Sequence, residues 1–339
     1  MTILCATDFS PAANDATQTA AAIARALAAP LHLVHVLDPS VEALTELQAD
    51  RAAALLEERL TRLGDSLHQQ TGAPVKTELR RGHVATELRA AAEATHARLL
   101  VVASQGHGAS SLLKLGGTSE RIAARAPLPV LVVRESGSFT SWAKGEPLRV
   151  MLALQDDEAG ASALRWLSAL RAAGPVDVVV GRVYYANEAH QQYGLGAVES
   201  PLSSAPDTEV EALIERDLQR RVPSLPGQGA LSYRAKRALG RVAEHLLELA
   251  EAERCQLVVV GSHGRTGLGR LWSVSSTALH LSRMSVAIVP PDGEGALQAP
   301  ARFQRLLVTT DFSRAAAAAI PWAYALAHPG AAVILAHVP

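Results

Sequence analysis

A phrase near the start of the chain returns almost unchanged near its end. Residues 3–10 read ILCATDFS, and residues 306–313 read LLVTTDFS. Each phrase is followed by an alanine-rich stretch and then by an apolar run that contains a His-Val pair, at residues 31–36 and 333–338. Repetition of this kind is typical of a chain built from copies of one structural unit. The repeat therefore restricts the fold to a small module that is used more than once.

Further matches show two full copies of the module. LLVVASQG at residues 99–106 corresponds to LVVVGSHG at residues 257–264, and PVLVV at 129–133 corresponds to SVAIV at 285–289. The second copy opens less clearly, at residues 150–154. The organisation that we expect is a domain over residues 1–135 (copy one), a linker over 136–146, a second domain over 147–291 (copy two), a linker over 292–302 and a partial third unit over 303–339.

The partial unit at residues 303–339 has room only for a strand, a helix and a strand. So short a segment buries too little apolar surface to be stable alone. We expect it either to be the first part of another full copy in a longer protein or to dock on a partner.

Within each full copy, short apolar runs alternate with longer stretches of helical period, such as the amphipathic stretch 41–70. The runs are apolar almost throughout, which is typical of strands buried on both faces of a parallel sheet. Each copy therefore predicts a doubly wound α/β sheet whose ligand crevice lies at the carboxyl ends of its strands. Copy two departs at residues 186–206, a stretch containing Gly, Ser and Pro that we expect to be a loop.

Composition excludes several classes of protein. The 339 residues contain 32 Lys plus Arg and 33 Asp plus Glu, so there is no overall positive field for nucleic acid. No apolar run approaches the roughly 18 residues needed to span a membrane, and residues 1–10 lack the pattern of a secretory signal. Cys5 and Cys255 do not form a disulfide framework and are expected to be buried. These features predict a cytoplasmic protein.

Glycine-rich segments follow the same strand in both copies. Copy two has GSHGRTGLGR at Gly261–Arg270, with Ser275 and Ser276 near an expected helix start. Copy one has Ala103–Gly106 and then Gly116–Ser119. Main-chain N–H groups close around a phosphate most easily where Gly leaves room, and a helix start adds oriented amides. The other interpretation is a tight strand-to-helix connection that needs Gly only for its backbone freedom.

An acid follows the first strand of copy one. There, Asp8 could accept hydrogen bonds from a ribose or a base edge. It could also cap the next helix, as could Ser10, and the two roles are compatible. The sequence has neither a GxxxxGK[ST] phosphate loop nor a G-x-S-x-G nucleophile elbow. The loop histidines His107 and His263 belong to a class that more often faces solvent than acts in catalysis.

The phrase Thr7–Ser10, the His35-Val36 pair and the Gly-x-x-Gly-nine-Gly-Ser/Thr spacing together resemble the universal stress protein family over nearly the whole chain. The resemblance implies a Rossmann-like, doubly wound five-stranded parallel sheet of the adenine nucleotide α-hydrolase-like class, repeated in tandem. It also implies a class of members that binds ATP and a class that has lost the site. The adenine nucleotide residues that it implies in copy one are Thr7, Asp8, Val36, Ala103, Gly106, Gly116, Gly117, Thr118 and Ser119. The weaker counterparts that it implies in copy two are Gly261, Gly264, Ser275 and Ser276.

Each copy departs from the family pattern in its own way. Ala103 stands at the first Gly position, and Gly117 stands at the Ser/Thr position, which keeps the amide but loses the hydroxyl. In copy two Val274 replaces the third Gly, where a β-branched side chain would crowd a phosphate. Gln155 replaces the strand-end acid. Copy one is therefore the favoured binder.

The sequence thus predicts a stress-response regulatory or sensor module that binds ATP, with or without Mg²⁺. The alternatives are a tandem scaffold that binds no nucleotide and a slow ATPase. We assign no catalytic residue and no protein metal ligand, and we expect neither nucleic acid nor membrane as a partner. The final strands, at residues 128–133 and 286–289, are expected to pair within the chain, and a homodimer is a further expectation.

Overall fold

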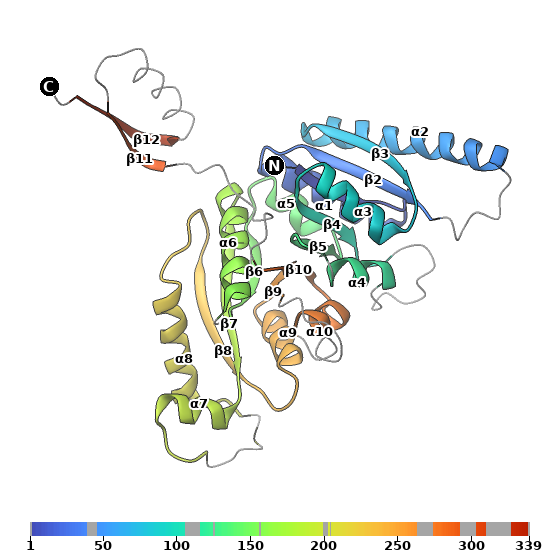
Figure 1. Cartoon of the computed structure of the whole chain (residues 1–339). Coiled ribbons are helices and arrows are strands. Elements are labelled where there is room, and N and C mark those ends of the chain that lie inside the picture. The colour runs from blue at the N-terminus through green and yellow to red at the C-terminus, as the bar shows by residue number, and fades with distance from the viewer. Residues whose placement is uncertain are drawn as a thin grey trace. The chain divides into compact units, whose positions relative to one another are not determined.

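The computed structural model describes most of the chain, and Figure 1 shows its elements. The described residues are 2–38, 46–105, 116–124, 126–155, 157–198, 203, 205–262, 274–291, 303–309 and 327–337. They belong to two compact units, Met1–Leu297 and Gln298–Pro339. The larger unit therefore contains both full copies of the module.

Copy one alternates strands and helices as its sequence predicts. Its elements are β1 (Thr2–Ala6), α1 (Pro11–Ala26), β2 (Leu31–Leu37), α2 (Glu46–Thr71), β3 (Val75–Arg81), α3 (Val84–Ala94), β4 (Ala97–Ala103), α4 (Gly117–Ala123) and β5 (Val130–Val133), followed by α5 (Gly137–Trp142). Pro11 occupies the start of α1, where its missing N–H costs nothing.

Copy two has the same order with one addition. Its elements are β6 (Leu148–Ala153), α6 (Glu158–Ala173), β7 (Val176–Tyr184), α7 (Ala186–Tyr193), α8 (Thr208–Arg221), β8 (Leu231–Arg237), α9 (Val242–Ala252), β9 (Leu257–Gly261), α10 (Val274–Leu281) and β10 (Ser285–Val289). The expected loop over 186–206 is wrong in its first part, because residues 186–193 form α7. The helix ends at Tyr193 and is capped by Gly194, whose φ of 66° is left-handed.

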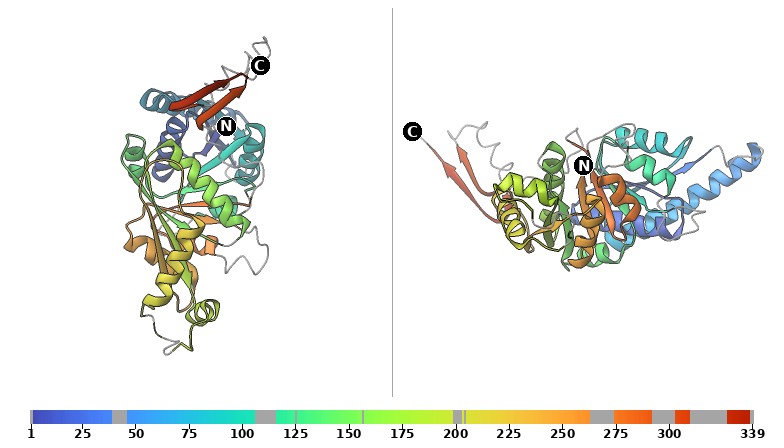
Figure 2. Two further views of the ribbon diagram at one scale, coloured as in Figure 1. Left: turned by 90° about the vertical axis from the view of Figure 1, so that its left-hand side faces the viewer. Right: turned by 90° about the horizontal axis from the view of Figure 1, so that it is seen from below.

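Among the described residues, ten strands form one sheet in the order β3-β2-β1-β4-β5-β10-β9-β6-β7-β8 (Figures 1 and 2). All neighbours within a copy are parallel. The copies join through β5 and β10, which pair antiparallel with Leu131 opposite Ala287. The predicted Rossmann-like α/β fold is confirmed, and the final strands pair as expected.

Side chains from both copies hold this junction. Arg134 donates from its main-chain N to Ser285 Oγ at 3.1 Å, and from Nη2 to the main-chain oxygen of Leu279, near the end of α10, at 3.0 Å. Glu120 Oε1 of α4 lies 3.4 Å from His280 Nε2 of α10. One hydrophobic cluster then runs through both copies and includes buried residues of α3, α4, α9 and α10. The two copies therefore share a core.

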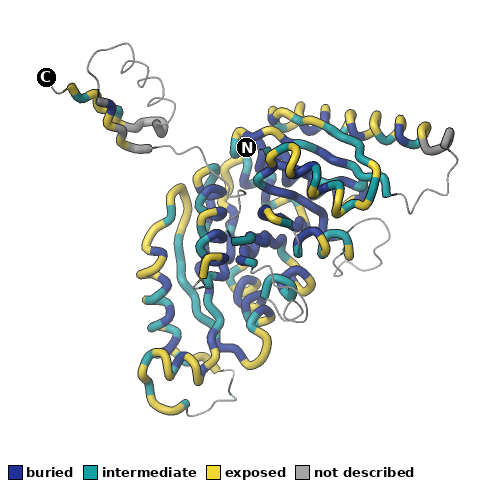
Figure 3. The backbone as a smooth tube through the Cα atoms, in the orientation of Figure 1, coloured by how far each residue is buried: buried dark blue, intermediate teal, exposed yellow. Residues whose placement is uncertain are grey.

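Burial follows the layers of the fold. Figure 3 shows the central strands buried and the helices alternating between buried and exposed faces. Because right-handed crossovers lead from β1 to β2 in one direction and from β3 to β4 in the other, α1 and α3 cover opposite faces of the sheet. Cys5 and Cys255 are buried free thiols, as expected, and burial raises the pKa of Cys255 to about 12.

The smaller unit contains β11 (Phe303–Thr309) and β12 (Ala327–Ala336), which pair parallel. Leu307, Ile334 and Leu335 are exposed in it. The helix expected between these strands lies outside the described residues. None of the helices described in either unit is both long and apolar enough to cross a membrane.

Candidate functional site

The predicted site of copy one lies at a topological switch point. In the sheet, β1 lies between β2 and β4, and the chain crosses from β1 to β2 on one side and from β3 to β4 on the other. In such sheets a crevice opens beyond the carboxyl ends of the two strands at the switch. Asp8 follows β1 and Ala103 ends β4, so both lie at this edge.

The turn after β1 is fixed by its own side chains. Asp8 Oδ1 accepts a hydrogen bond from the main-chain N of Ser10 at 2.9 Å, and Ser10 Oγ accepts one from Ala13 N at 3.1 Å. Ser10 is therefore the N-cap of α1, whereas Asp8 orders the turn that leads into it. Phe9 between them has a φ of 62°, a left-handed conformation that is strained for a bulky residue.

Two side chains from β2 and α2 hold this strained turn in place. His35 Nδ1 donates to the main-chain oxygen of Thr7 at 2.7 Å, and the rings of His35 and Phe9 lie 4.8 Å apart. The guanidinium of Arg59, from α2, lies 4.4 Å above the Phe9 ring. Burial lowers the pKa of His35, although the Thr7 bond and the Asp8 charge oppose that shift. Sequence reasoning missed Arg59, because nothing in the pattern of α2 indicates which exposed cation reaches the turn.

The glycine-rich element of copy one returns to the end of β4. Gly116 donates from its main-chain N to Ser104 O at 2.8 Å and is the N-cap of α4. Ser119 Oγ donates to Ala103 O at 2.7 Å. An added Cβ at Gly117 would meet no atom of the described residues within 4 Å, and Thr118 is partly exposed. These contacts bring Gly116–Ser119 to the same edge of the sheet as Asp8.

The remaining predicted residues of copy one are less informative. Val36 lies near the end of β2, is partly buried and packs against the shared hydrophobic cluster. Gly106 lies outside the described residues. Among the described residues, no three His, Cys, Asp or Glu side chains gather as metal ligands would.

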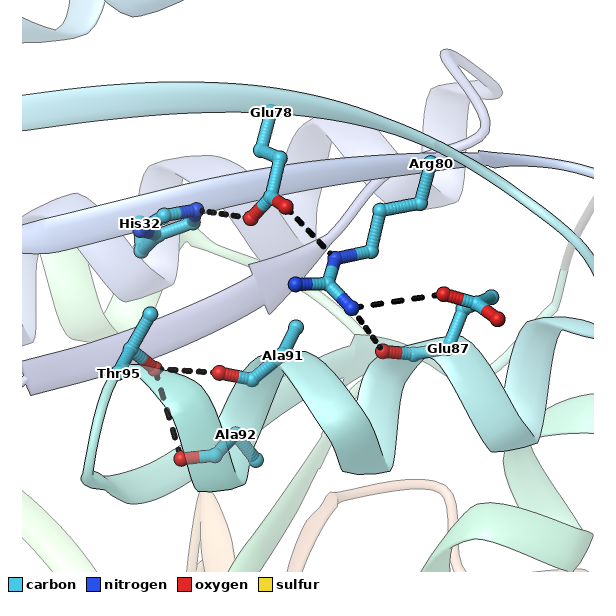
Figure 4. A network of polar contacts seen from close by, with 7 residues as sticks. All are labelled: His32, Glu78, Arg80, Glu87, Ala91, Ala92 and Thr95. Carbon is cyan, nitrogen blue, oxygen red and sulfur yellow. Dashed lines mark hydrogen bonds and ion pairs between the residues drawn. The ribbon is translucent and has the colours of Figure 1, made fainter.

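A polar network crosses the outer strands of copy one (Figure 4). Glu78 on β3 lies 2.9 Å from His32 Nε2 and 2.8 Å from Arg80 Nε. Arg80 Nη1 lies 3.4 Å from Glu87 Oε2, so the network reaches α3. It connects β2, the edge strand β3 and α3. None of these residues stands out in the sequence.

The same positions in copy two can be assigned from the strand register. Ala6 pairs with Val34 in copy one, and Ala153 pairs with Gly181 in copy two. The N-caps Ser10 and Asp157 follow these strands at the same spacing. Asp8 therefore corresponds to Gln155, and Val36 corresponds to Val183.

The second half of each copy can be matched in the same way. Gly82 and Gly240 both have left-handed φ values, of 140° and 120°, just before α3 and α9. Counting from this pair, Ala103 corresponds to Gly261 and Gly116 to Val274. Of the predicted residues in copy two, Ser275 and Ser276 lie in the first turn of α10, and Gly264 lies outside the described residues.

A cavity of about 370 Å³ lies at these positions in copy two. The residues that line it include Leu154, Gln155, Val183 and Val274, the counterparts of Thr7, Asp8, Val36 and Gly116. By the strand register, this cavity has the same position in copy two as the crevice predicted beside Asp8 has in copy one. Sequence reasoning ranked copy two below copy one but gave no size or shape to its crevice.

Gly261 has a packing role in the structure. An added Cβ there would lie 2.6 Å from both the main-chain carbon and the main-chain oxygen of Ala159, on α6. The absence of a side chain therefore allows α6 to approach β9 closely. This close contact explains why glycine occupies position 261 without reference to any ligand.

Comparison with known proteins places the chain in a family. The universal stress protein family profile matches residues 1–134 and 148–290. A universal stress protein of Mycolicibacterium smegmatis is 30% identical over 305 residues, covering 85% of this chain and 97% of that protein. A Thermus aquaticus universal stress protein is 36% identical over 134 residues, covering 39% of this chain and 98% of that protein.

Solved structures agree at the level of the fold. The crystal structure of a universal stress protein from Archaeoglobus fulgidus superposes with a TM-score of 0.62 at 15% identity, covering 86% of this chain and 98% of that one. The repeated parallel sheet, the two profile matches and the nearly full-length relative lead to one conclusion: this chain belongs to the universal stress protein family.

Proposed function

We propose that copy one binds an adenine nucleotide, with ATP as the favoured ligand, and that binding serves a regulatory or sensor role. The observation that carries this proposal is the placement of Asp8 and Gly116–Ser119 at the two sides of the β1/β4 switch point. Open-sheet proteins bind nucleotides at that location. Family membership supports the same ligand class.

Different groups at this site can bind different parts of a nucleotide. The Asp8 carboxylate can accept hydrogen bonds from ribose hydroxyls, and the main chain near Val36 can contact the adenosine. The first turn of α4 offers the main-chain N–H groups of Gly117, Thr118 and Ser119 to phosphate oxygens, and the missing side chain of Gly117 leaves room for them. Mg²⁺, when bound, would neutralise phosphate charge. These roles are those of binding.

The direct test is calorimetric titration of ATP into the full chain and into two variants. Asp8→Ala should weaken ATP binding by about tenfold, because it removes a charged hydrogen-bond acceptor. Gly116→Val should weaken it further, because the side chain intrudes on the phosphate turn. Asp65→Ala is the matched control, since Asp65 is an exposed acid of α2. Equal affinity in all four proteins, or no binding at millimolar ATP, would refute the proposal.

A gain-of-function variant sharpens that test. Gly117→Ser restores the hydroxyl that the family element carries, and the open space at Gly117 accommodates it. One added hydrogen bond should tighten ATP binding by a factor of about five, on the order of 1 kcal/mol. Gly117→Ala is the control, because it changes the first residue of α4 without adding a hydroxyl. It should leave the ATP affinity unchanged.

A further inference from the structure

We propose that the crevice of copy two binds an uncharged ligand of nucleoside size and discriminates against ligands that carry phosphates. The inference takes its ligand class from the function proposed for copy one. It is carried by the residues that line the cavity of about 370 Å³. That volume lies in the range of small-molecule sites.

Three described residues that line this crevice toward its phosphate end are apolar. Val274 is the first residue of α10 and lines the cavity, whereas its counterpart Gly116 has no side chain. Val274 also packs against the shared hydrophobic cluster, and Val242 and Leu246 line the cavity with it. A phosphate placed here would exchange water for methyl groups, which is costly for an ion.

The opposite end has lost its charge but kept its polarity. Gln155 lines the cavity at the position of Asp8 and replaces a carboxylate with an amide. An amide both donates and accepts hydrogen bonds, so it can pair with a ribose hydroxyl or a base edge without requiring a charged ligand. Leu154 replaces Thr7 beside it and makes this end more apolar.

The two charged residues that line the cavity already have protein partners. Arg182 takes the position of His35, and its Nη1 lies 4.0 Å from Asp217 on α8. Asp157 Oδ1 accepts from the main-chain N of Gly160 at 2.9 Å and caps α6. These groups therefore do not supply a free charge for a nucleotide. Among the described residues that line the cavity, the wall is therefore mostly apolar, and Gln155 supplies a neutral polar side chain.

The test uses the full chain with copy one silenced by a double variant: Gly116→Val blocks its phosphate turn, and Asp8→Ala removes its ribose acceptor. Titration with adenosine should then give one site, and ATP should bind at least tenfold more weakly. Adding Gln155→Leu should weaken adenosine about tenfold, because a group that hydrogen-bonds the ligand is lost. Adding Gln155→Asp and Val274→Gly together should instead raise ATP affinity at least tenfold. Thermal melts check folding, and Asp8→Ala alone is the alternative background if the double variant unfolds.

The outcomes separate the two proposals. If wild type binds ATP but the variant with copy one silenced binds neither adenosine nor ATP, the inference is overturned and the function proposed for copy one stands. Equal affinity of that variant for adenosine and ATP also overturns it. If wild type binds no ATP while adenosine binds in a manner that depends on Gln155, the inference stands and the function proposed for copy one fails.

Discussion

The imidazole of His35 donates from Nδ1 to the main-chain oxygen of Thr7 across 2.7 Å. A side chain near the end of β2 thereby holds the residue that immediately precedes Asp8. Because Phe9 on the other side of Asp8 is strained and stacks on the same ring, the position of the carboxylate depends on His35.

Replacing His35 should therefore affect both stability and binding. We expect His35→Ala to lower the free energy of unfolding by about 1–2 kcal/mol and to weaken ATP binding several-fold. His68 is a matched control, because its Nδ1 makes the same kind of bond to Ala73 O, at 2.8 Å, at the end of α2. His68→Ala should lower stability similarly and leave the affinity unchanged. Equal loss of affinity in both variants would contradict a positioning role for His35.

The packing role of Gly261 predicts a large effect of one methyl group. Gly261→Ala would place a Cβ 2.6 Å from main-chain atoms of Ala159, so α6 must shift. We expect a loss of about 1–3 kcal/mol in urea unfolding, the usual range for overpacking a core. Gly196→Ala is the control, because an added Cβ there meets none of the described atoms within 4 Å. If the two variants prove equally stable, the close helix–strand approach is wrong.

Arg134 should contribute to the stability of both copies at once. Arg134→Met keeps the aliphatic stem but removes the bond to Leu279 O, and we expect a loss of about 1–2 kcal/mol. Arg62→Met removes only an exposed pair with Glu58 and should cost less than about 0.5 kcal/mol. Urea unfolding followed by probes in each copy measures the difference. A shift of one copy alone would contradict a shared core.

His190 predicts a stability that depends on pH. Its Nδ1 lies 2.8 Å from Gly196 O and its Nε2 2.8 Å from Asp207 Oδ2. Both partners are acceptors, so only the protonated ring satisfies them together. The bond to Asp207 chiefly, and that to Gly196, raise the pKa of His190, while burial and Arg237 oppose the shift.

The sign of this effect follows from linkage. A raised pKa in the folded state stabilises the protein fully below the unfolded value of about 6.5, and the contribution is lost as the pH rises through the folded pKa. The stability difference between wild type and His190→Gln should therefore be largest near pH 5.5 and shrink toward pH 8.5. Denaturant titrations across that range measure it, alongside the NMR titration of His190. A difference that grows with pH would refute this assignment.

The sequence by itself determined the repeated module, the order of its elements and the edge at which Asp8 and Gly116–Ser119 gather. Repeats and hydrophobic periodicity report local structure, and parallel strands bring their carboxyl ends together once their order is known. The tertiary structure decided what depends on partners distant in the chain. It assigned the cap of α1 to Ser10, placed Arg59 over Phe9, and gave Gly261 its contact with Ala159. The formation of α7 and the register of β5 against β10 also came only from packing, because a short segment's own preferences are too weak to fix which distant surface it meets.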